Sequence, residues 1–241
     1  MNRLPVVEVF GPTIQGEGAL AGVPTAFVRF GGCDYRCVWC DSLHAVVPEA
    51  VREAPRMTTA ELAEALDSML ARPDWVTLSG GNPALFELGD LVARLHDAGR
   101  RIAVETQGSI WREWLAEVDL LTVSPKPPSS GMLSPEHDAG ADRFLARAVN
   151  GRCNLVVKVV VFDEQDYAWA QMLHERWIRL PFYLSCGTDP PRVDTPHAET
   201  LRSVSDRYRW LCERAAHDPV MVDARILPQL HVLAWGHEKG R

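Results

Sequence analysis

The stretch Ala26-Phe27-Val28-Arg29-Phe30-Gly31-Gly32-Cys33-Asp34-Tyr35-Arg36-Cys37-Val38-Trp39-Cys40 decides the fold of this chain. Its first five residues are apolar apart from one arginine, which predicts a buried strand that ends just before the cysteines. Three cysteines then follow on a single short loop, Cys33, Cys37 and Cys40. Thiols packed this closely, outside a secreted disulfide scaffold, are typical of a metal site.

Composition places the chain among ordinary globular proteins. It has 241 residues, of which 46% are hydrophobic and 24% charged, so we expect a single domain over residues 1–241. The net charge of −7 argues against a nucleic-acid partner, because phosphate binding needs a basic surface. No apolar run is long enough to span a membrane, and Met1–Pro5 carries no apolar signal core. We therefore expect a cytoplasmic protein that has no membrane partner.

Strand and helix patterns alternate along the chain after the first strand. The predicted strands span 26–30, 75–78, 102–105, 120–123, 155–161 and 182–184, with a last extended stretch at 220–222. Six helices are predicted between these strands. The first follows a capping box at 58–61, the second covers 88–95, and a short third one contains Trp111 and Trp114. The last three cover 142–149, a segment through Met172, and 201–215. Such alternation implies parallel strands with right-handed crossovers. About six units fall short of a closed eight-fold barrel, so we expect an α/β fold, a partial (β/α)6-type barrel of mostly parallel strands.

Polar residues follow the predicted strands at the point where each strand ends. They are Cys33, Ser79 with Gly80 and Gly81, Glu105 with Gln107, Ser124 with Lys126, and Ser185. In a parallel barrel the carboxyl ends of the strands meet at one mouth, which is where ligands bind. The sequence therefore predicts that cluster and substrate lie together at the C-terminal mouth.

The cysteine loop suits an iron–sulfur cluster that keeps one iron open. Electron-transfer clusters use four cysteines, whereas this loop supplies three and the remaining cysteines (Cys153, Cys186 and Cys212) are scattered. An iron without a thiolate can bind an external ligand, and this makes chemistry possible. Two other interpretations stay open: a zinc site completed by His44, and three cysteines that are merely buried.

Several segments together resemble one family. They are FGPTIQGEG at 10–18, CDS at 40–42, SGGNP at 79–83, ETQG at 105–108, SPKPP at 124–128 and LPQLH at 227–231. The three-cysteine spacing after a strand resembles the radical S-adenosylmethionine superfamily, and the other segments resemble the 7-carboxy-7-deazaguanine synthase family within it. The resemblance runs from Phe10 to Gly236.

The resemblance implies a ring contraction in queuosine-type biosynthesis. In that reaction 6-carboxy-5,6,7,8-tetrahydropterin becomes 7-carboxy-7-deazaguanine with loss of ammonia. The implied cofactors are a 4Fe-4S cluster, S-adenosylmethionine and Mg²⁺. The implied partners are the small-molecule pterin, an electron donor such as a flavodoxin or ferredoxin, and a second copy of the chain in a homodimer.

The resemblance also assigns roles to residues. The cluster ligands, and so the catalytic centre, are Cys33, Cys37 and Cys40. Contacts to S-adenosylmethionine fall on Trp39, Asp41, Gly81, Gln107, Ser124, Pro125, Lys126, Leu184, Ser185, Cys186 and Gly187. An acidic residue usually follows the paired glycines and helps to bind the methionine amino group. Here that residue is Asn82, which lacks the charge and which, with Pro83, would also suit the start of a helical turn.

The substrate contacts implied by the resemblance lie mainly near the N-terminus. They are Ile14, Gln15, Gly16, Glu17, Arg29, Ser79 and His231, and Ser42 is the implied magnesium ligand. Arg29 in an apolar strand must be paired or must face a carboxylate, because a lone buried charge is prohibitive. Each of these residues also has a purely structural interpretation. They are an ion pair for Arg29, a solvated loop position for Glu17, a core position for His231 and capping of the loop for Ser42.

Two other functions share the cysteine loop. A radical-generating activase of a glycyl-radical protein has the same spacing, but it predicts a protein partner and no acidic pterin pocket. A zinc-stabilised binding module would catalyse no reaction. Iron–sulfur reconstitution followed by an absorbance spectrum separates the binding module from both enzymes.

Overall fold

The computed structural model describes residues 3–69, 75–190, 196–238 and 240. One nine-stranded sheet runs through it in the order β3-β1-β2-β4-β5-β6-β7-β8-β9. The strands are β1 (Leu4–Ile14), β2 (Pro24–Phe30), β3 (Arg56–Met57), β4 (Trp75–Gly80), β5 (Arg101–Thr106), β6 (Leu120–Val123), β7 (Asn154–Val161), β8 (Phe182–Cys186) and β9 (Arg225–Leu227). From β2 to β9 all neighbours are parallel, and β1 is antiparallel to both β2 and β3.

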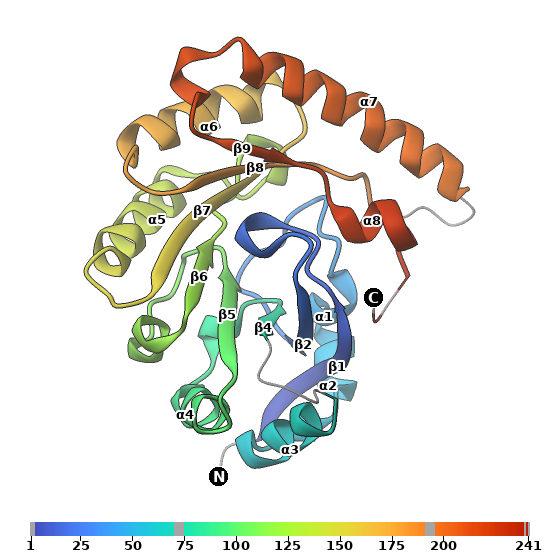
Figure 1. Ribbon diagram of the computed structural model, residues 1–241, viewed down its shortest axis with the longest axis vertical. Helices are drawn as coiled ribbons and strands as arrows, with labels where there is room; N and C mark the ends of the chain where they lie inside the picture. Colours follow the sequence, from blue (N-terminus) through green and yellow to red (C-terminus); the bar gives the residue numbers. More distant parts are fainter. Residues whose placement is uncertain (1–2, 70–74, 191–195, 239, 241) are drawn as a thin grey trace.

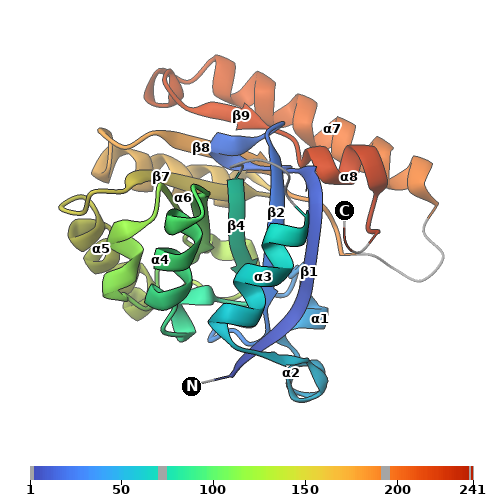
Figure 2. The same ribbon diagram turned by 60° about the horizontal axis from the view of Figure 1, so that its bottom comes forward.

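The sheet curves into a barrel that stays open, with helices on its outer side (Figure 1). The helices are α1 (Leu43–Val46), α2 (Pro48–Glu53), α3 (Thr59–Met69), α4 (Gly89–Asp97), α5 (Pro135–Ala148), α6 (Glu164–Arg176), α7 (His197–Ala216) and α8 (Leu230–Trp235). Figure 2 shows α3 and α4 in front of the sheet, with α7 and α8 along the β8–β9 edge. The predicted partial barrel of mostly parallel strands is confirmed. Among the described residues no helix has both the length and the hydropathy for a membrane crossing.

The first strand, β1, was not predicted from the sequence. β1 pairs with β2 along most of its length, and Phe10 stacks on Phe27 with ring centroids 5.1 Å apart. Gly11-Pro12 interrupts the strand, and the register shifts between Phe10 and Thr13. Because proline cannot donate to a ladder, its presence within a run argues against a strand, and this hid β1.

The chain near residue 220 is a correction. Residues 220–222 were expected to be extended, but Pro219–Met221 forms the 3₁₀ helix η5, and the last strand is β9. Asp218 caps this turn, since its Oδ1 accepts from the Val220 backbone N–H at 2.9 Å. An Asp-Pro pair is a helix-start signal, and it overrides the apolar run that suggested a strand.

Three boundaries also shift. α5 begins at Pro135 rather than near 142, because Ser134 accepts from the His137 backbone N–H. Trp111 lies ahead of the 3₁₀ helix η3 (Glu113–Glu117), which contains Trp114. β8 extends to Cys186, so Ser185 lies inside the strand. The capping box at 58–61 is confirmed, since the Thr58 N–H donates to Glu61 and the Glu61 N–H donates to the Thr58 hydroxyl.

The side chains on the inner face of the barrel change from apolar to polar along its strands. A small apolar cluster, made of Ala103, Leu120, Val156 and Tyr183, fills the base. Side chains two residues further along the same strands share that face, because strand side chains alternate. Those residues are Glu105, Thr122, Lys158 and Ser185. The barrel therefore has an apolar floor, with a polar layer nearer the carboxyl ends of its strands.

Gly81 lets two backbones meet directly beside the cysteine loop. A Cβ at Gly81 would lie 1.9 Å from the Gly32 carbonyl oxygen and 3.0 Å from the Cys33 nitrogen. The Asn82 N–H donates to that same Gly32 oxygen at 2.8 Å. The turn after β4 thus fixes the backbone that leads into Cys33.

We predict that Gly81→Ala displaces the start of the cysteine loop. Overpacking of this kind costs about 1–3 kcal/mol, so the melting temperature and the iron content after reconstitution should both fall. Gly89→Ala is the matched control, since its Cβ would meet only the Trp114 Cβ at 3.7 Å. If Gly81→Ala melts and loads iron like Gly89→Ala, the close approach does not position the loop.

Candidate active site

One cavity of about 310 Å³ opens at the carboxyl ends of the strands, a volume suited to a small molecule. Seventeen of the predicted site residues line it: Ile14, Gln15, Gly16, Glu17, Arg29, Cys33, Cys37, Trp39, Cys40, Asp41, Ser42, Ser79, Gly81, Gln107, Ser124, Lys126 and His231. Residues that are 191 positions apart in sequence, such as Cys40 and His231, therefore meet at one mouth. This matches the expected location.

Five predicted contact residues lie outside the lining of this cavity. They are Pro125, Leu184, Ser185, Cys186 and Gly187. The side chains of β8 are buried, and those of Leu184 and Cys186 are fully buried. The contacts to S-adenosylmethionine expected at 184–187 stay a prediction.

The cysteine loop is held from the opposite side of the mouth. The Val38 N–H donates to the Ser130 carbonyl at 3.0 Å, and the Trp39 indole N–H donates to the Ser129 hydroxyl at 2.9 Å. Ser129 in turn donates to Asp166, a fully buried carboxylate on α6. A chain of hydrogen bonds thus anchors the loop to a helix of the outer layer.

The three thiols fit an iron–sulfur cluster better than zinc. Tetrahedral zinc about 2.3 Å from each sulfur needs sulfurs about 3.8 Å apart. The described residues contain one set of three or more metal-binding side chains whose ligand atoms all lie within 4.8 Å, and it is Glu17, Asp41 and His231, not the cysteines. His44 instead contacts Glu8, at 3.4 Å. Because the three cysteines do not form such a set, at least one of their sulfur–sulfur distances exceeds 4.8 Å, which is too wide for one zinc ion and compatible with a larger cluster.

Burial raises the pKa of all three cysteine thiols. The pKa of Cys40 rises to about 11, because the Asp41 charge adds to the effect of burial. At Cys33 and Cys37 the ammonium of Lys126 opposes the rise. Thiolates are the metal-binding form, so cluster assembly must release protons here, and Lys126 is the cation placed to favour it.

A buried network of charges crosses the cavity. Lys158 from β7 forms an ion pair with Glu17, and its Nζ lies 3.5 Å from Glu105 Oε1 on β5. Glu105 also accepts from Ser79 at 3.2 Å and from Gln15 at 3.4 Å. The network therefore joins the N-terminal loop to the inner faces of three strands.

The network holds both ends of its ion pair charged. Burial alone would raise the pKa of Glu17, but the charges of Lys158 and His231 lower it to about 2. Burial would lower the pKa of Lys158, but Glu105 and Glu17 raise it. Glu17 therefore faces the cavity as a carboxylate at neutral pH.

A second cluster of polar and charged side chains surrounds Arg29. Its Nε donates to Glu8 Oε2 at 2.7 Å, and its Nη1 donates to the Ser42 hydroxyl at 2.8 Å. Ser42 then donates to Asp41 at 3.0 Å. The structural ion pair considered for Arg29 is present, and the arginine still lines the cavity.

His231 closes the site against the N-terminal loop. The Leu230 N–H donates to the Gly16 carbonyl at 3.0 Å, and a Cβ at Gly16 would lie 2.1 Å from His231 Nδ1. His231, Glu17 and Asp41 bring their ligand atoms within 4.8 Å of one another. The C-terminal helix thus completes a pocket that the N-terminal loop begins.

The sequence analysis missed several polar residues that bond to predicted site residues, among them Glu8, Asp34, Lys158 and Gln229. Lys158 carried a usable signal, because it is a lone charge inside an apolar strand, as is Arg29. Asp34 and Gln229 lie in segments that the sequence already placed in the site, but only the fold shows that their side chains meet Gln107 and Glu17, and Glu8 lies on the strand that was not predicted.

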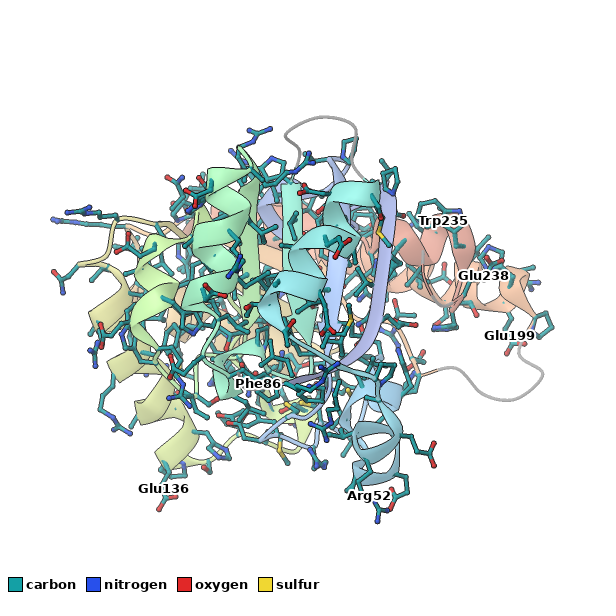
Figure 3. The ribbon with its side chains drawn as sticks, turned by 90° about the horizontal axis from the view of Figure 1, so that it is seen from below. Arg52, Phe86, Glu136, Glu199, Trp235 and Glu238 are labelled. Carbon is teal, nitrogen blue, oxygen red and sulfur yellow. The ribbon has the colours of Figure 1, made fainter. Side chains whose placement is uncertain are left out.

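The outer edge of the molecule carries exposed charged side chains. Seen from below, Glu136, Glu199 and Arg52 lie at the outer edge of the molecule, whereas Phe86 lies inside the outline (Figure 3). Phe86 packs on Phe30 with ring centroids 5.8 Å apart.

Comparison with known proteins agrees with this geometry. Residues 27–124 match the family model of the radical SAM superfamily. The chain is 40% identical to 7-carboxy-7-deazaguanine synthase of Bacillus cereus over 100% of both chains, and 40% identical to that of Bacillus subtilis over 98% of both. It superposes on QueE from Escherichia coli with a TM-score of 0.64 over 94% of each chain at 21% identity, which shows a shared fold. The chain belongs to the 7-carboxy-7-deazaguanine synthase family of radical S-adenosylmethionine enzymes.

Proposed function

We propose that this chain converts 6-carboxy-5,6,7,8-tetrahydropterin to 7-carboxy-7-deazaguanine with loss of ammonia. The observation that carries the proposal is one cavity lined by both the three-cysteine loop and the buried Glu17–Lys158 ion pair. When bound, the cluster and S-adenosylmethionine supply a 5′-deoxyadenosyl radical. The chain must then hold the substrate and keep water away from it.

The charged network suits the pyrimidine edge of a pterin. Glu17, Glu105 and Lys158 together carry one net negative charge on the inner face of the barrel. That edge presents an amino group and a ring N–H, which are donors that a buried carboxylate can accept. Lys158 holds Glu17 ionised for this purpose, and His231 lies beside it.

Arg29 is the group that suits the substrate carboxylate. Its Nε and Nη1 are engaged by Glu8 and Ser42, whereas its Nη2 donates no hydrogen bond within the described part of the chain. The hydroxyl of Ser42 lies next to it and is the proposed magnesium ligand. One neutral oxygen binds magnesium weakly, so this site should form together with substrate and water oxygens.

The partners of the reaction follow from its chemistry. Reductive cleavage needs an electron donor, for which a flavodoxin or ferredoxin is the proposed class. A homodimer, a cytoplasmic location and a role in queuosine-type biosynthesis complete the proposal. Chromatography with light scattering tests the homodimer.

A glycyl-radical activase is a weaker candidate. It would act on a protein backbone, which lacks the adjacent amino and ring N–H donors that suit the ionised Glu17. The Bacillus relatives, which match over nearly their whole length, are named synthases. A zinc-stabilised module would leave the buried charges without a ligand.

Turnover tests the function directly. Anaerobic incubation with 6-carboxytetrahydropterin, S-adenosylmethionine and dithionite should give 7-carboxy-7-deazaguanine, detected by mass spectrometry. Cys40→Ala should lose the cluster and form neither product nor 5′-deoxyadenosine. Cys153→Ala, which lies outside the cavity, should keep both. Absence of product from a fully loaded wild-type enzyme would contradict the proposed reaction.

Lys158→Met should weaken substrate binding. Removing one partner of a buried charge pair costs about 2–5 kcal/mol, so the Kd for the pterin should rise roughly 30-fold or more. Cleavage of S-adenosylmethionine without substrate should persist at equal cluster content. Because the single variant leaves Glu17 unpaired, Lys158→Met/Glu17→Gln serves as a neutral control for folding. If both variants bound the substrate with wild-type affinity, this charged network would not contribute to substrate binding.

Ser42→Ala should reduce the dependence of turnover on magnesium. We expect product formation to fall about tenfold while iron content is unchanged, because one oxygen ligand is lost. Ser42→Thr keeps the hydroxyl and should restore the response. A magnesium titration with the same midpoint in Ser42→Ala and wild type would exclude Ser42 as a ligand.

A further inference from the structure

Arg29 reaches the cavity with its charge already paired. Glu8 on β1 lies directly opposite Arg29 on β2, and the Arg29 Nε donates to Glu8 Oε2 at 2.7 Å. His44 on α1 contacts the same Glu8 oxygen at 3.4 Å. The hydrogen bonds from His44 and from Arg29 lower the pKa of Glu8 to about 2, although burial opposes this effect. Glu8 is therefore a carboxylate at neutral pH, and it offsets the charge of Arg29.

A second carboxylate, that of Asp41, is linked to Arg29 through Ser42. The Arg29 Nη1 donates to the Ser42 hydroxyl at 2.8 Å, and this hydroxyl donates to Asp41 at 3.0 Å. Glu8, Arg29, Asp41 and Ser42 all line the cavity, and together they carry one net negative charge. A protonated His44 would bring this group only to neutrality. The group therefore offers no net attraction to a substrate carboxylate, whereas its oxygens suit a hard cation such as magnesium.

We propose that Glu8 makes the binding of the substrate carboxylate depend on magnesium. Because Glu8 offsets Arg29, the arginine alone does not balance the charge that the substrate brings, and a divalent cation beside Ser42 is needed to do so. Two ligands that favour each other's binding are coupled, and each strengthens the other by the same factor. Glu8 acts through Arg29, so it is a positioning residue that sets this coupling and not a ligand of the metal. This inference rests on the proposed function.

Glu8→Gln removes the charge at nearly constant shape. The amide oxygen can still accept from the Arg29 Nε, so the arginine keeps its place. In magnesium-free buffer the variant should bind 6-carboxytetrahydropterin about tenfold more tightly than wild type, because the Arg29 charge is then available to the substrate. At saturating magnesium this gain should disappear. The Kd values are measured by anaerobic equilibrium dialysis of the reconstituted enzyme at matched iron content, without a reductant, so that no turnover occurs.

A purely structural role for Glu8 gives the opposite result. If Glu8 only held Arg29 in place, Glu8→Gln would bind the pterin more weakly in both buffers, and this result, like unchanged constants, would overturn the proposal. Glu8→Asp keeps the charge and should keep the magnesium dependence of wild type. Glu49→Gln is the matched control, because it removes the same charge and leaves Arg52 without its partner, but on the exposed surface of α2. It should bind the pterin like wild type in both buffers.

A substrate analogue with hydrogen in place of the carboxylate locates the effect. Tetrahydropterin lacks the charge that Arg29 and magnesium would balance, so its Kd should be the same, within about twofold, for wild type and Glu8→Gln in both buffers. An equal gain for this analogue in Glu8→Gln would show that Glu8 acts on another part of the substrate, and it would refute the inference. If wild type binds the carboxylated pterin with the expected magnesium dependence but forms no deazaguanine, the proposed function fails while the role of Glu8 stands.

Discussion

The arrangement of the site depends on one buried ion pair, that between Lys158 and Glu17. Taking two charges out of water is costly, and the cost is offset only if each charge keeps good partners. Glu105 provides a second carboxylate for Lys158, and Gln229 donates to Glu17. Because these groups come from β7, β5, the N-terminal loop and the segment before α8, satisfying the charges forces distant parts of the chain together. The same requirement that stabilises the pocket therefore gives it its polarity.

The two halves of the mouth are held by different interactions. Around the cysteines, backbone hydrogen bonds, the Ser129–Asp166 anchor and the close glycine contact at Gly81 fix the loop, while burial raises the pKa of its thiols. Around Glu17, ionised groups dominate and are shielded from water. A cluster that binds with release of protons suits the first half, and a substrate read through its N–H donors suits the second. The two halves of the mouth differ in their interactions because different backbone segments end at each side of the barrel.

Much of the fold could be predicted from the sequence, because alternation of strands and helices, capping signals and the cysteine loop are local patterns. The failures were cases in which local signals compete. A proline inside β1 hid a strand that pairing with β2 stabilises, and an Asp-Pro start turned an apolar run at 219–221 into a helical turn. Glu8 and Gln229 could not be assigned, since nothing near them in sequence indicates that Arg29 and Glu17 are their partners.

Lys158 shows where sequence reasoning had room to go further. β7 is buried on both faces, so its apolar run shows no alternation from which an inner face could be read. The single charge supplies that information, because an ammonium inside such a strand must meet a carboxylate, and only the barrel interior can bring one from another segment. The argument that selected Arg29 as a site residue applies equally to Lys158. A lone charge in a strand of a parallel barrel thus predicts both the direction of its side chain and an acidic partner across the mouth.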